Sequence, residues 1–211
     1  MNDFLKSLNQ KVTSCKIPFQ HWEISDPLNK ETINEIVNIS TPKGARVYDG
    51  TRAADDTGGG IDGKLRLFID KNNYHSYPNL TSLINTLQKT ECIKIISKYL
   101  NRNLNKSYVR LEVISDKKGF WLKPHKDIKE KIMTMLIWIN PYKESEKLGT
   151  DFYDSDFNIV KTSKYIDNTG YFFSSGGDTW HGLEKKEIVI ERKCIQINYV
   201  SFKTDWPVQN I

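Results

Sequence analysis

The chain has 211 residues, of which 38% are hydrophobic and 27% are charged, with a net charge of +5 and only three cysteines. A chain of this length suits one domain that buries roughly 70% of its unfolded surface, so a core can form without disulfides. Cys15, Cys92 and Cys194 are an odd number at wide spacing, which excludes a disulfide framework and a CxxC zinc pair and indicates a reducing compartment.

Localisation and partners follow from the same reading. The N-terminal segment MNDFLKSLNQKV has no apolar run behind a basic start, so we expect no secretory signal. No stretch approaches the ~20 consecutive apolar residues of a membrane span. The lysines are scattered beside acidic residues and do not form the basic stripe of a nucleic-acid platform. We therefore expect a cytoplasmic protein that binds neither a membrane nor a nucleic acid, while its oligomeric state stays open.

Residues 1 to about 105 are expected to mix helices and loops. Asp26-Pro27, a capping residue followed by proline, predicts a helix start, and the helix would run to about Ile39. Leu80 to Leu100 has apolar residues at helical spacing and predicts a second helix. Between them, RAADDTGGGIDG contains Gly58 to Gly60 and predicts a loop. This loop is either a lid over a site or an ordinary surface loop.

After residue 105 the pattern changes to that of strands. Ser107 to Ile114 alternates polar and apolar residues, and Ile132 to Ile139 is an apolar run typical of a strand buried on both faces. Tyr171 to Ser174 and Ile195 to Phe202 are further strands. Helices first and strands afterwards predict a mainly β chain with N-terminal helices (α+β), built as a β-sandwich or jelly-roll barrel.

The last predicted strand has two different faces. Arg192, Cys194, Gln196 and Asn198 lie on one face, and apolar residues lie on the other. An edge strand would turn such a polar face to water, whereas a barrel with a cavity would turn it inward around a ligand.

The segment GFWLKPHKD carries a candidate metal site. His125 and Asp127 are two residues apart in an extended segment, so their side chains can reach one metal ion together. His181, in the turn GDTWHG, is the best candidate for a third ligand. Two imidazoles and one carboxylate are the ligand set of non-haem iron(II) oxygenases, which leaves three coordination positions open. A 2-oxo acid and dioxygen can occupy those positions.

Arg192 follows His181 by eleven residues and lies on the predicted inward face. A buried arginine needs an anionic partner, and its planar fork matches a carboxylate such as the distal one of 2-oxoglutarate. Each piece alone has an ordinary explanation: a chance HxD pair, a hydrogen-bonded histidine near a turn, or an arginine paired with Glu184 or Glu191. The order in which the pieces occur on strand-like segments favours the metal site.

This ordered set resembles the iron(II)/2-oxoglutarate-dependent dioxygenase superfamily, especially its prolyl-hydroxylase-like branch. The resemblance covers about residues 107 to 202 and is carried by GFWLKPHKD, MTMLIWIN (Met133 to Asn140), LGTDFY (Leu148 to Tyr153), TWHGLE and Arg192. It implies a double-stranded β-helix, a small jelly roll, within a single domain 1–211. Residues 1–105 would supply helical support and the substrate region, and residues 106–203 the core with the metal site.

The resemblance also implies a role for each matching residue. His125, Asp127 and His181 would be the iron ligands and the catalytic centre, Arg192 the 2-oxoglutarate anchor, and Thr134 a second co-substrate contact. Two positions depart from the usual pattern: Cys194 stands where a serine is common, and the usual double glycine is Leu148-Gly149. The implied cofactors are Fe(II), 2-oxoglutarate as co-substrate and O2, with ascorbate as a reductant.

The implied reaction is hydroxylation of an unactivated C–H bond of a small metabolite or a protein residue, with release of succinate and CO2. The substrate is left open, because a fold does not determine a function. Two other classes remain: a cupin-like metalloenzyme that does not use 2-oxoglutarate, and a non-catalytic jelly-roll binding module. A nucleic-acid demethylase is a third and narrower alternative.

Overall fold

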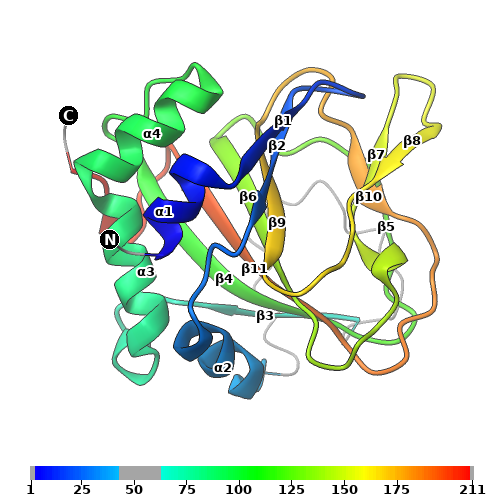
Figure 1. The fold of residues 1–211 in the computed structure, drawn as a ribbon, viewed down its shortest axis with the longest axis horizontal. Coiled ribbons are helices and arrows are strands. Elements are labelled where there is room, and N and C mark those ends of the chain that lie inside the picture. Colours follow the sequence, from blue (N-terminus) through cyan, green and yellow to red (C-terminus); the bar gives the residue numbers. More distant parts are fainter. Residues whose placement is uncertain (1–2, 43–62, 210–211) are drawn as a thin grey trace.

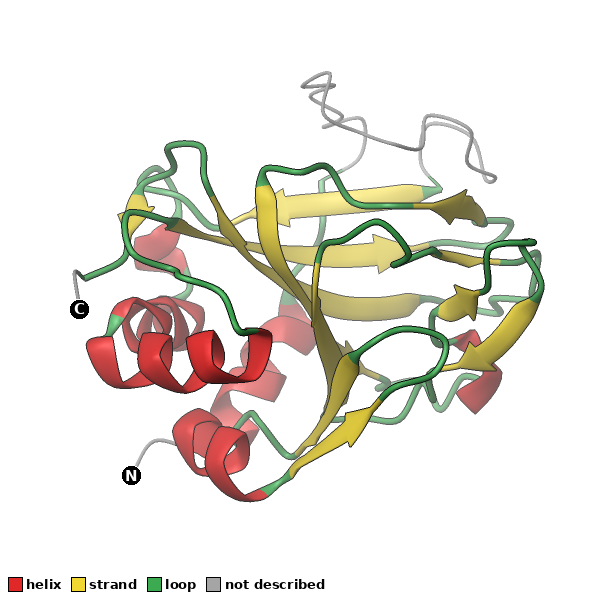
Figure 2. Cartoon of the chain, turned by 90° about the horizontal axis from the view of Figure 1, so that it is seen from above, coloured by secondary structure: helices red, strands yellow, loops and turns green. Residues whose placement is uncertain are grey.

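Two antiparallel β-sheets face each other, and the α-helices cover the outer face of the larger sheet (Figure 1). A computed structural model describes residues 3–42 and 63–209, so the predicted loop at Gly58 to Gly60 lies outside the described residues. Seen from above, the α-helices gather on one side of the strands (Figure 2). The order of layers is therefore helices, larger sheet, smaller sheet.

The larger sheet has eight strands and the smaller one has four, and all strand pairs are antiparallel. In spatial order the larger sheet contains β1 (Val12–Cys15), β2 (His21–Ser25), β9 (Thr169–Ser174), β6 (Lys131–Ile139), β11 (Arg192–Val200), β4 (Tyr108–Asp116) and β12 (Trp206–Pro207), with β3 (Lys64–Phe68) also paired to β4. The smaller sheet contains β5 (Leu122–His125), β10 (His181–Leu183), β7 (Asp151–Tyr153) and β8 (Ile159–Thr162).

The helices and the two faces of the larger sheet define two hydrophobic cores. The helices are α1 (Asp3–Gln10), α2 (Lys30–Asn38), α3 (Pro78–Gln88) and α4 (Thr90–Leu100), with the short 3-10 turns η1 (Tyr74–Ser76) and η2 (Glu146–Leu148). Their buried apolar residues pack on one face of the larger sheet, at residues such as Ile195 and Ile197. Alternate residues such as Trp138 and Cys194 point the other way, toward Phe152 of the smaller sheet. The space between the sheets is thus the inward side that the sequence predicted.

The predicted strands are present. β4, β6, β9 and β11 contain the segments that the alternation and the apolar runs indicated, with ends that differ by one to three residues. β6 is buried on both faces from Met133 to Ile139, because it lies between β9 and β11 and is covered by both cores. The prediction of a mainly β chain with N-terminal helices is confirmed.

The predicted helix start at Asp26-Pro27 is wrong by several residues. α2 begins at Lys30, and its N-cap is Asn29, whose side-chain oxygen accepts a hydrogen bond from the Thr32 amide at 2.9 Å. Asp26 instead has a left-handed backbone (φ 49°) and pairs with Lys11. Both residues are good caps, but only Asn29 has the extended backbone that an N-cap requires.

The long predicted helix is also divided. α3 ends at Gln88 and α4 begins at Thr90, because Lys89 between them is extended (ψ 141°). The carbonyls released at this break find partners from distant parts of the chain. Tyr199 Oη donates to the Leu87 carbonyl at 2.7 Å, and the Gln209 amide donates to the Gln88 carbonyl at 3.0 Å. These contacts are tertiary, so helical spacing alone could not reveal the break.

None of the helices in residues 3–42 and 63–209 has the length and apolar character needed to cross a membrane.

Candidate metal centre

His125 and His181 meet at the edge of the smaller sheet. His125 is the last residue of β5 and His181 the first of β10, and their Cα atoms are direct partners in the antiparallel pair. Their ring centroids are 4.3 Å apart. Asp127 follows β5, and one ligand atom from each of the three residues lies within 4.8 Å of the other two. The structure therefore brings together three side chains from distant parts of the sequence.

Both imidazoles are fixed in the same way by the backbone. His125 Nδ1 lies 3.0 Å from the Lys123 carbonyl, and His181 Nδ1 lies 2.9 Å from the Thr179 carbonyl. A carbonyl can only accept, so Nδ1 carries the proton in each ring and Nε2 keeps its lone pair. An Nδ1–H bonded to a carbonyl is the arrangement that orients histidine ligands of metals.

The carboxylate of Asp127 is held by two donors. Lys131 Nζ donates to one of its oxygens at 2.5 Å and Thr134 Oγ1 to the other at 2.5 Å. Asn198 Nδ2 in turn donates to Thr134 Oγ1 at 2.9 Å, which fixes the hydroxyl. The only proton of the Thr134 hydroxyl is thus directed to Asp127, so the structure gives this residue an orienting position beside a candidate ligand. Its contact with a co-substrate stays a prediction.

The electrostatics of the site favour the protonation states that a divalent metal needs. Burial and the neighbouring His181 lower the pKa of His125 to about 3, and burial also lowers the pKa of His181. Burial alone would raise the pKa of Asp127, but the Lys131 ammonium and the hydrogen bonds to the carboxylate hold it well below its usual range. At neutral pH the site therefore offers two neutral imidazoles and one carboxylate, which fit Fe(II) without the loss of a proton.

Arg192 lies on the inward face at the start of β11 and is only 4% exposed. Its guanidinium donates to Asp116 and to the Leu148 carbonyl and stacks 4.6 Å from the centre of the Trp138 ring. Its carboxylate partner is therefore Asp116, and not the glutamates at 184 or 191 that the sequence suggested as ordinary partners.

The surroundings of Arg192 carry an excess positive charge. Lys64 Nζ lies 3.9 Å from Asp116 Oδ1, an atom that accepts no hydrogen bond from the described part of the chain. Two cations thus share one carboxylate in a buried region. Such a region favours one more negative charge, such as a carboxylate of a ligand.

Sequence reasoning missed Lys131, Asp116 and Lys64. Asp116 could have been found by extending the alternation of the strand 107–114 by one more polar position, which makes it the Cα partner of Arg192. Lys131 follows Asp127 by four residues, but this spacing has no meaning outside a helix. Lys64 reaches the site only through the pairing of β3 with β4.

A buried ion pair lies further along the same inward face. Arg66 donates to both oxygens of Glu112, at 2.7 Å for Nη2–Oε1, and Arg110 Nη2 donates to Asn198 Oδ1 at 3.2 Å. Both arginines were candidates for binding an anionic substrate, with ion pairing as the ordinary alternative. The pairing of Arg66 with Glu112 confirms the ordinary alternative for that residue.

The Glu112 pair predicts a pH-dependent stability. Burial alone would raise the pKa of Glu112, but Arg66 and Arg110 lower it from 4.5 to about 2. The stabilisation of about 3 kcal/mol is present above pH 4.5 and is lost as the pH falls toward 2, because the unfolded chain takes up the proton first. Urea unfolding of wild type and Glu112→Gln should therefore differ at pH 7 and converge toward pH 2. A constant difference over this range would contradict the assignment.

Comparisons with known proteins show the fold at low sequence identity. No protein-family model matches the sequence, and no curated protein matches it either. A prolyl-4-hydroxylase from Pseudomonas putida is similar with a TM-score of 0.60 at 10% identity, covering 96% of this chain and 100% of that one. A prolyl hydroxylase from Trichoplax adhaerens, solved with a hypoxia inducible factor peptide fragment, has a TM-score of 0.55 at 18% identity, covering 95% and 88%.

A third similar structure is HygX from Streptomyces hygroscopicus, solved with nickel and 2-oxoglutarate, with a TM-score of 0.57 at 10% identity, covering 88% of this chain and 85% of that one. These similarities extend over most of the chain, including the helices that the sequence resemblance did not reach. The chain therefore has the fold of the prolyl-hydroxylase-like oxygenases, and the resemblance predicted from residues 107 to 202 is confirmed at the level of fold.

Proposed function

We propose that the chain is a non-haem iron(II)- and 2-oxoglutarate-dependent dioxygenase that hydroxylates a C–H bond of a small metabolite or a protein residue, releasing succinate and CO2. The observation that carries the proposal is the convergence of His125, Asp127 and His181 within 4.8 Å, with both imidazoles already held in the metal-binding tautomer. The two facing antiparallel sheets support a double-stranded β-helix core within a single domain 1–211.

The residues of the chain would divide the work as follows. His125, Asp127 and His181 would hold the iron, which, with 2-oxoglutarate and O2, supplies the oxidising power for the reaction. Lys131 and Thr134 keep Asp127 ionised and oriented through their hydrogen bonds. Arg192, with the excess charge of Lys64, would bind the distal carboxylate of 2-oxoglutarate. The buried aromatic residues between the sheets, such as Phe173 beside His181, exclude water from this region.

The proposal is tested without knowledge of the substrate. Iron(II) and then 2-oxoglutarate are added anaerobically to the purified chain, and the visible metal-to-ligand charge-transfer band of the chelated 2-oxo acid is recorded. The band is expected, and in air 2-oxoglutarate should be converted to succinate in an iron-dependent way. If iron binds but no band appears, a cupin-like metalloenzyme becomes the better assignment. If 2-oxoglutarate binds without iron, the binding-module alternative is favoured.

The anchor residue has its own prediction. Arg192→Lys keeps the positive charge beside Asp116 but removes the planar fork that matches a carboxylate. The affinity for 2-oxoglutarate, measured from the charge-transfer band, should fall by roughly tenfold or more. Iron(II) binding in the absence of 2-oxoglutarate and the melting temperature should stay close to wild type, which separates an anchoring role from a structural one. Unchanged 2-oxoglutarate affinity would remove Arg192 from the site.

The charge near the metal ligands favours an anionic substrate. A cavity of about 430 Å³ adjoins Asp127 and is bordered by the basic side chains of Arg102, Lys126, Lys129 and Lys131. Lys131 is neutralised by Asp127, so three positive charges remain at the rim. In a screen by succinate release, compounds or peptides with a carboxylate or phosphate should be turned over faster than their neutral counterparts, and more so at low salt. A preference for the neutral members would contradict this substrate class.

A further inference from the structure

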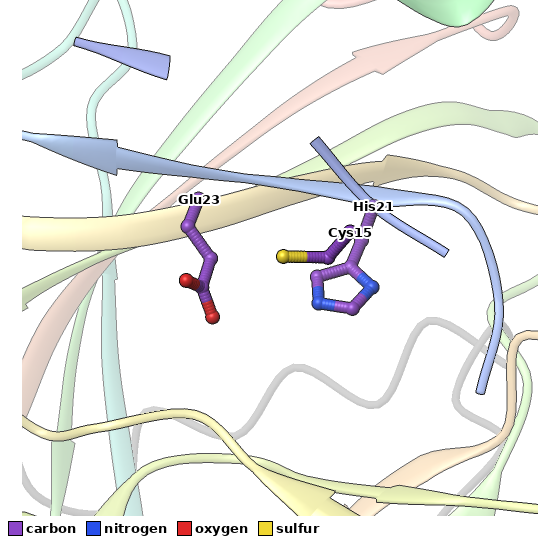
Figure 3. Close-up of side chains that lie close together, drawn as sticks. All are labelled: Cys15, His21 and Glu23. Carbon is purple, nitrogen blue, oxygen red and sulfur yellow. The ribbon is translucent and has the colours of Figure 1, made fainter. Parts of the chain in front are cut away.

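The β1–β2 hairpin carries a second cluster of metal-binding side chains, remote in sequence from the first. Cys15 is the last residue of β1, and its Cα partner across the antiparallel pair is His21 of β2. Glu23 lies two residues further on the same face of β2. One ligand atom from each residue lies within 4.8 Å of the others, and Figure 3 shows the three side chains projecting from the same side of the hairpin.

His21 is oriented like the two histidines of the candidate metal centre. Its Nδ1 lies 2.8 Å from the Phe19 carbonyl, so Nδ1 carries the proton and the lone pair of Nε2 is directed into the cluster. The ring is fully buried and packs against Phe152, with ring centroids 4.9 Å apart. Burial lowers the pKa of His21, which keeps the imidazole neutral at physiological pH. A fixed, neutral imidazole with its lone pair directed at a thiol and a carboxylate is prepared to bind a cation.

A cation of the chain itself already lies where the three side chains converge. Lys161, from β8 of the smaller sheet, places Nζ 2.7 Å from Glu23 Oε1, 3.2 Å from His21 Nε2 and 3.5 Å from Cys15 Sγ. The three donors of the ammonium thus match three acceptors. The ammonium marks a point at which a positive charge is stabilised by a carboxylate, an imidazole and a sulfur atom together.

We propose that Cys15, His21 and Glu23 form a binding site for a thiophilic divalent cation of the zinc class, which enters by displacing the Lys161 ammonium. Thiolate, imidazole and carboxylate are all ligands of Zn²⁺. On binding, the Cys15 thiol releases its proton to water, and two anionic ligands then balance the charge of the ion. The Lys161–Glu23 pair is partly exposed, with side-chain exposures of 29% and 42%, so it is weak and can open to solvent.

This second site is distinct from the candidate metal centre. The order of the smaller sheet is β5-β10-β7-β8, so Lys161 on β8 and His125 on β5 lie on opposite edges. The two ligand sets also differ chemically, because the cluster on the hairpin includes a thiol and the candidate metal centre does not. A probe that reports sulfur coordination therefore reports the hairpin alone.

Cobalt(II) is such a probe. Titration of the full chain with Co²⁺ is expected to produce a near-ultraviolet thiolate-to-cobalt charge-transfer band, which Zn²⁺ then bleaches by competition. The band can be assigned to Cys15, because Cys92 and Cys194 are fully buried in the cores. Absence of the band in the native chain overturns the proposal, since the native ammonium would then exclude the metal.

Three variants complete the test. Cys15→Ser should lose the band, whereas His181→Ala should keep it, so failure of this site and failure of the proposed oxygenase site can be told apart. Lys161→Met removes the competing ammonium at nearly constant length, and it should tighten Co²⁺ binding by about tenfold or more. A band that survives in Cys15→Ser, or an unchanged affinity in Lys161→Met, would overturn the proposal. Melting curves without metal confirm that each variant is folded.

Discussion

Replacement of His181 by alanine is expected to abolish the charge-transfer band and the iron-dependent release of succinate. His181 is 7% exposed, is fixed by the Thr179 carbonyl, and is the Cα partner of His125. The variant would leave one imidazole and one carboxylate, which hold iron(II) poorly. The loss of affinity should be at least about 100-fold, since removal of an outer-shell partner alone costs 10–100-fold. Anaerobic iron(II) titration measures this directly.

A matched control is His75→Ala. His75 is exposed on η1 and contacts Tyr74, away from both clusters of candidate ligands. This variant should bind iron(II) and 2-oxoglutarate as the wild type does. If His181→Ala binds iron as tightly as His75→Ala, then His181 is not a ligand and the proposed function loses its main support.

The strand that carries Arg192 could be predicted in full, because two physical signals agree there. Its alternation is regular, and its polar face is too long and too varied for an edge strand in water. In the structure all nine residues of β11 are buried, and Gln196 and Asn198 find their partners between the sheets. A buried polar face needs such partners, so the presence of polar residues at inward positions indicated a cavity or a network.

The candidate metal ligands are a different case. Local geometry explains why His125 and Asp127 can act together, but nothing in the sequence places His181 opposite His125. That placement depends on the antiparallel pairing of β5 with β10, two short strands of four and three residues. Strands this short carry almost no alternation, so the third ligand came from resemblance and not from periodicity.

The cluster of Cys15, His21 and Glu23 was not found from the sequence at all. The spacing between the cysteine and the histidine resembles no compact metal motif, and the fourth participant, Lys161, is 146 residues from Cys15. Three features bring them together: the β1–β2 hairpin, the buried packing of Phe19 and His21 against Phe152, and the position of β8 at the edge of the smaller sheet. All three are tertiary, and they become visible only when the two sheets face each other.

Gly149 marks a position at which the backbone and the candidate co-substrate pocket depend on each other. A Cβ added there would lie 1.6 Å from the Ser163 carbonyl oxygen and 2.5 Å from the carbonyl carbon. Ser163 cannot move aside easily, because its amide donates to the Thr150 carbonyl and its hydroxyl accepts from the Thr150 amide, both at 2.8 Å. The preceding residue, Leu148, supplies the carbonyl that Arg192 Nε contacts. One of the two usual glycines is therefore retained because no side chain fits.

Gly149→Ala should consequently destabilise the fold by about 3 kcal/mol or more, since the clash is between backbone atoms that are already hydrogen-bonded. For a chain of this length the melting temperature would fall by roughly 10 °C. Gly177→Ala is the matched control, because a Cβ there meets nothing within 4 Å and should change the stability by less than about 0.5 kcal/mol. Equal melting temperatures for the two variants would show that the Ser163 segment yields. If the Gly149 variant folds at low temperature but binds 2-oxoglutarate weakly, the displacement has reached Arg192 through Leu148.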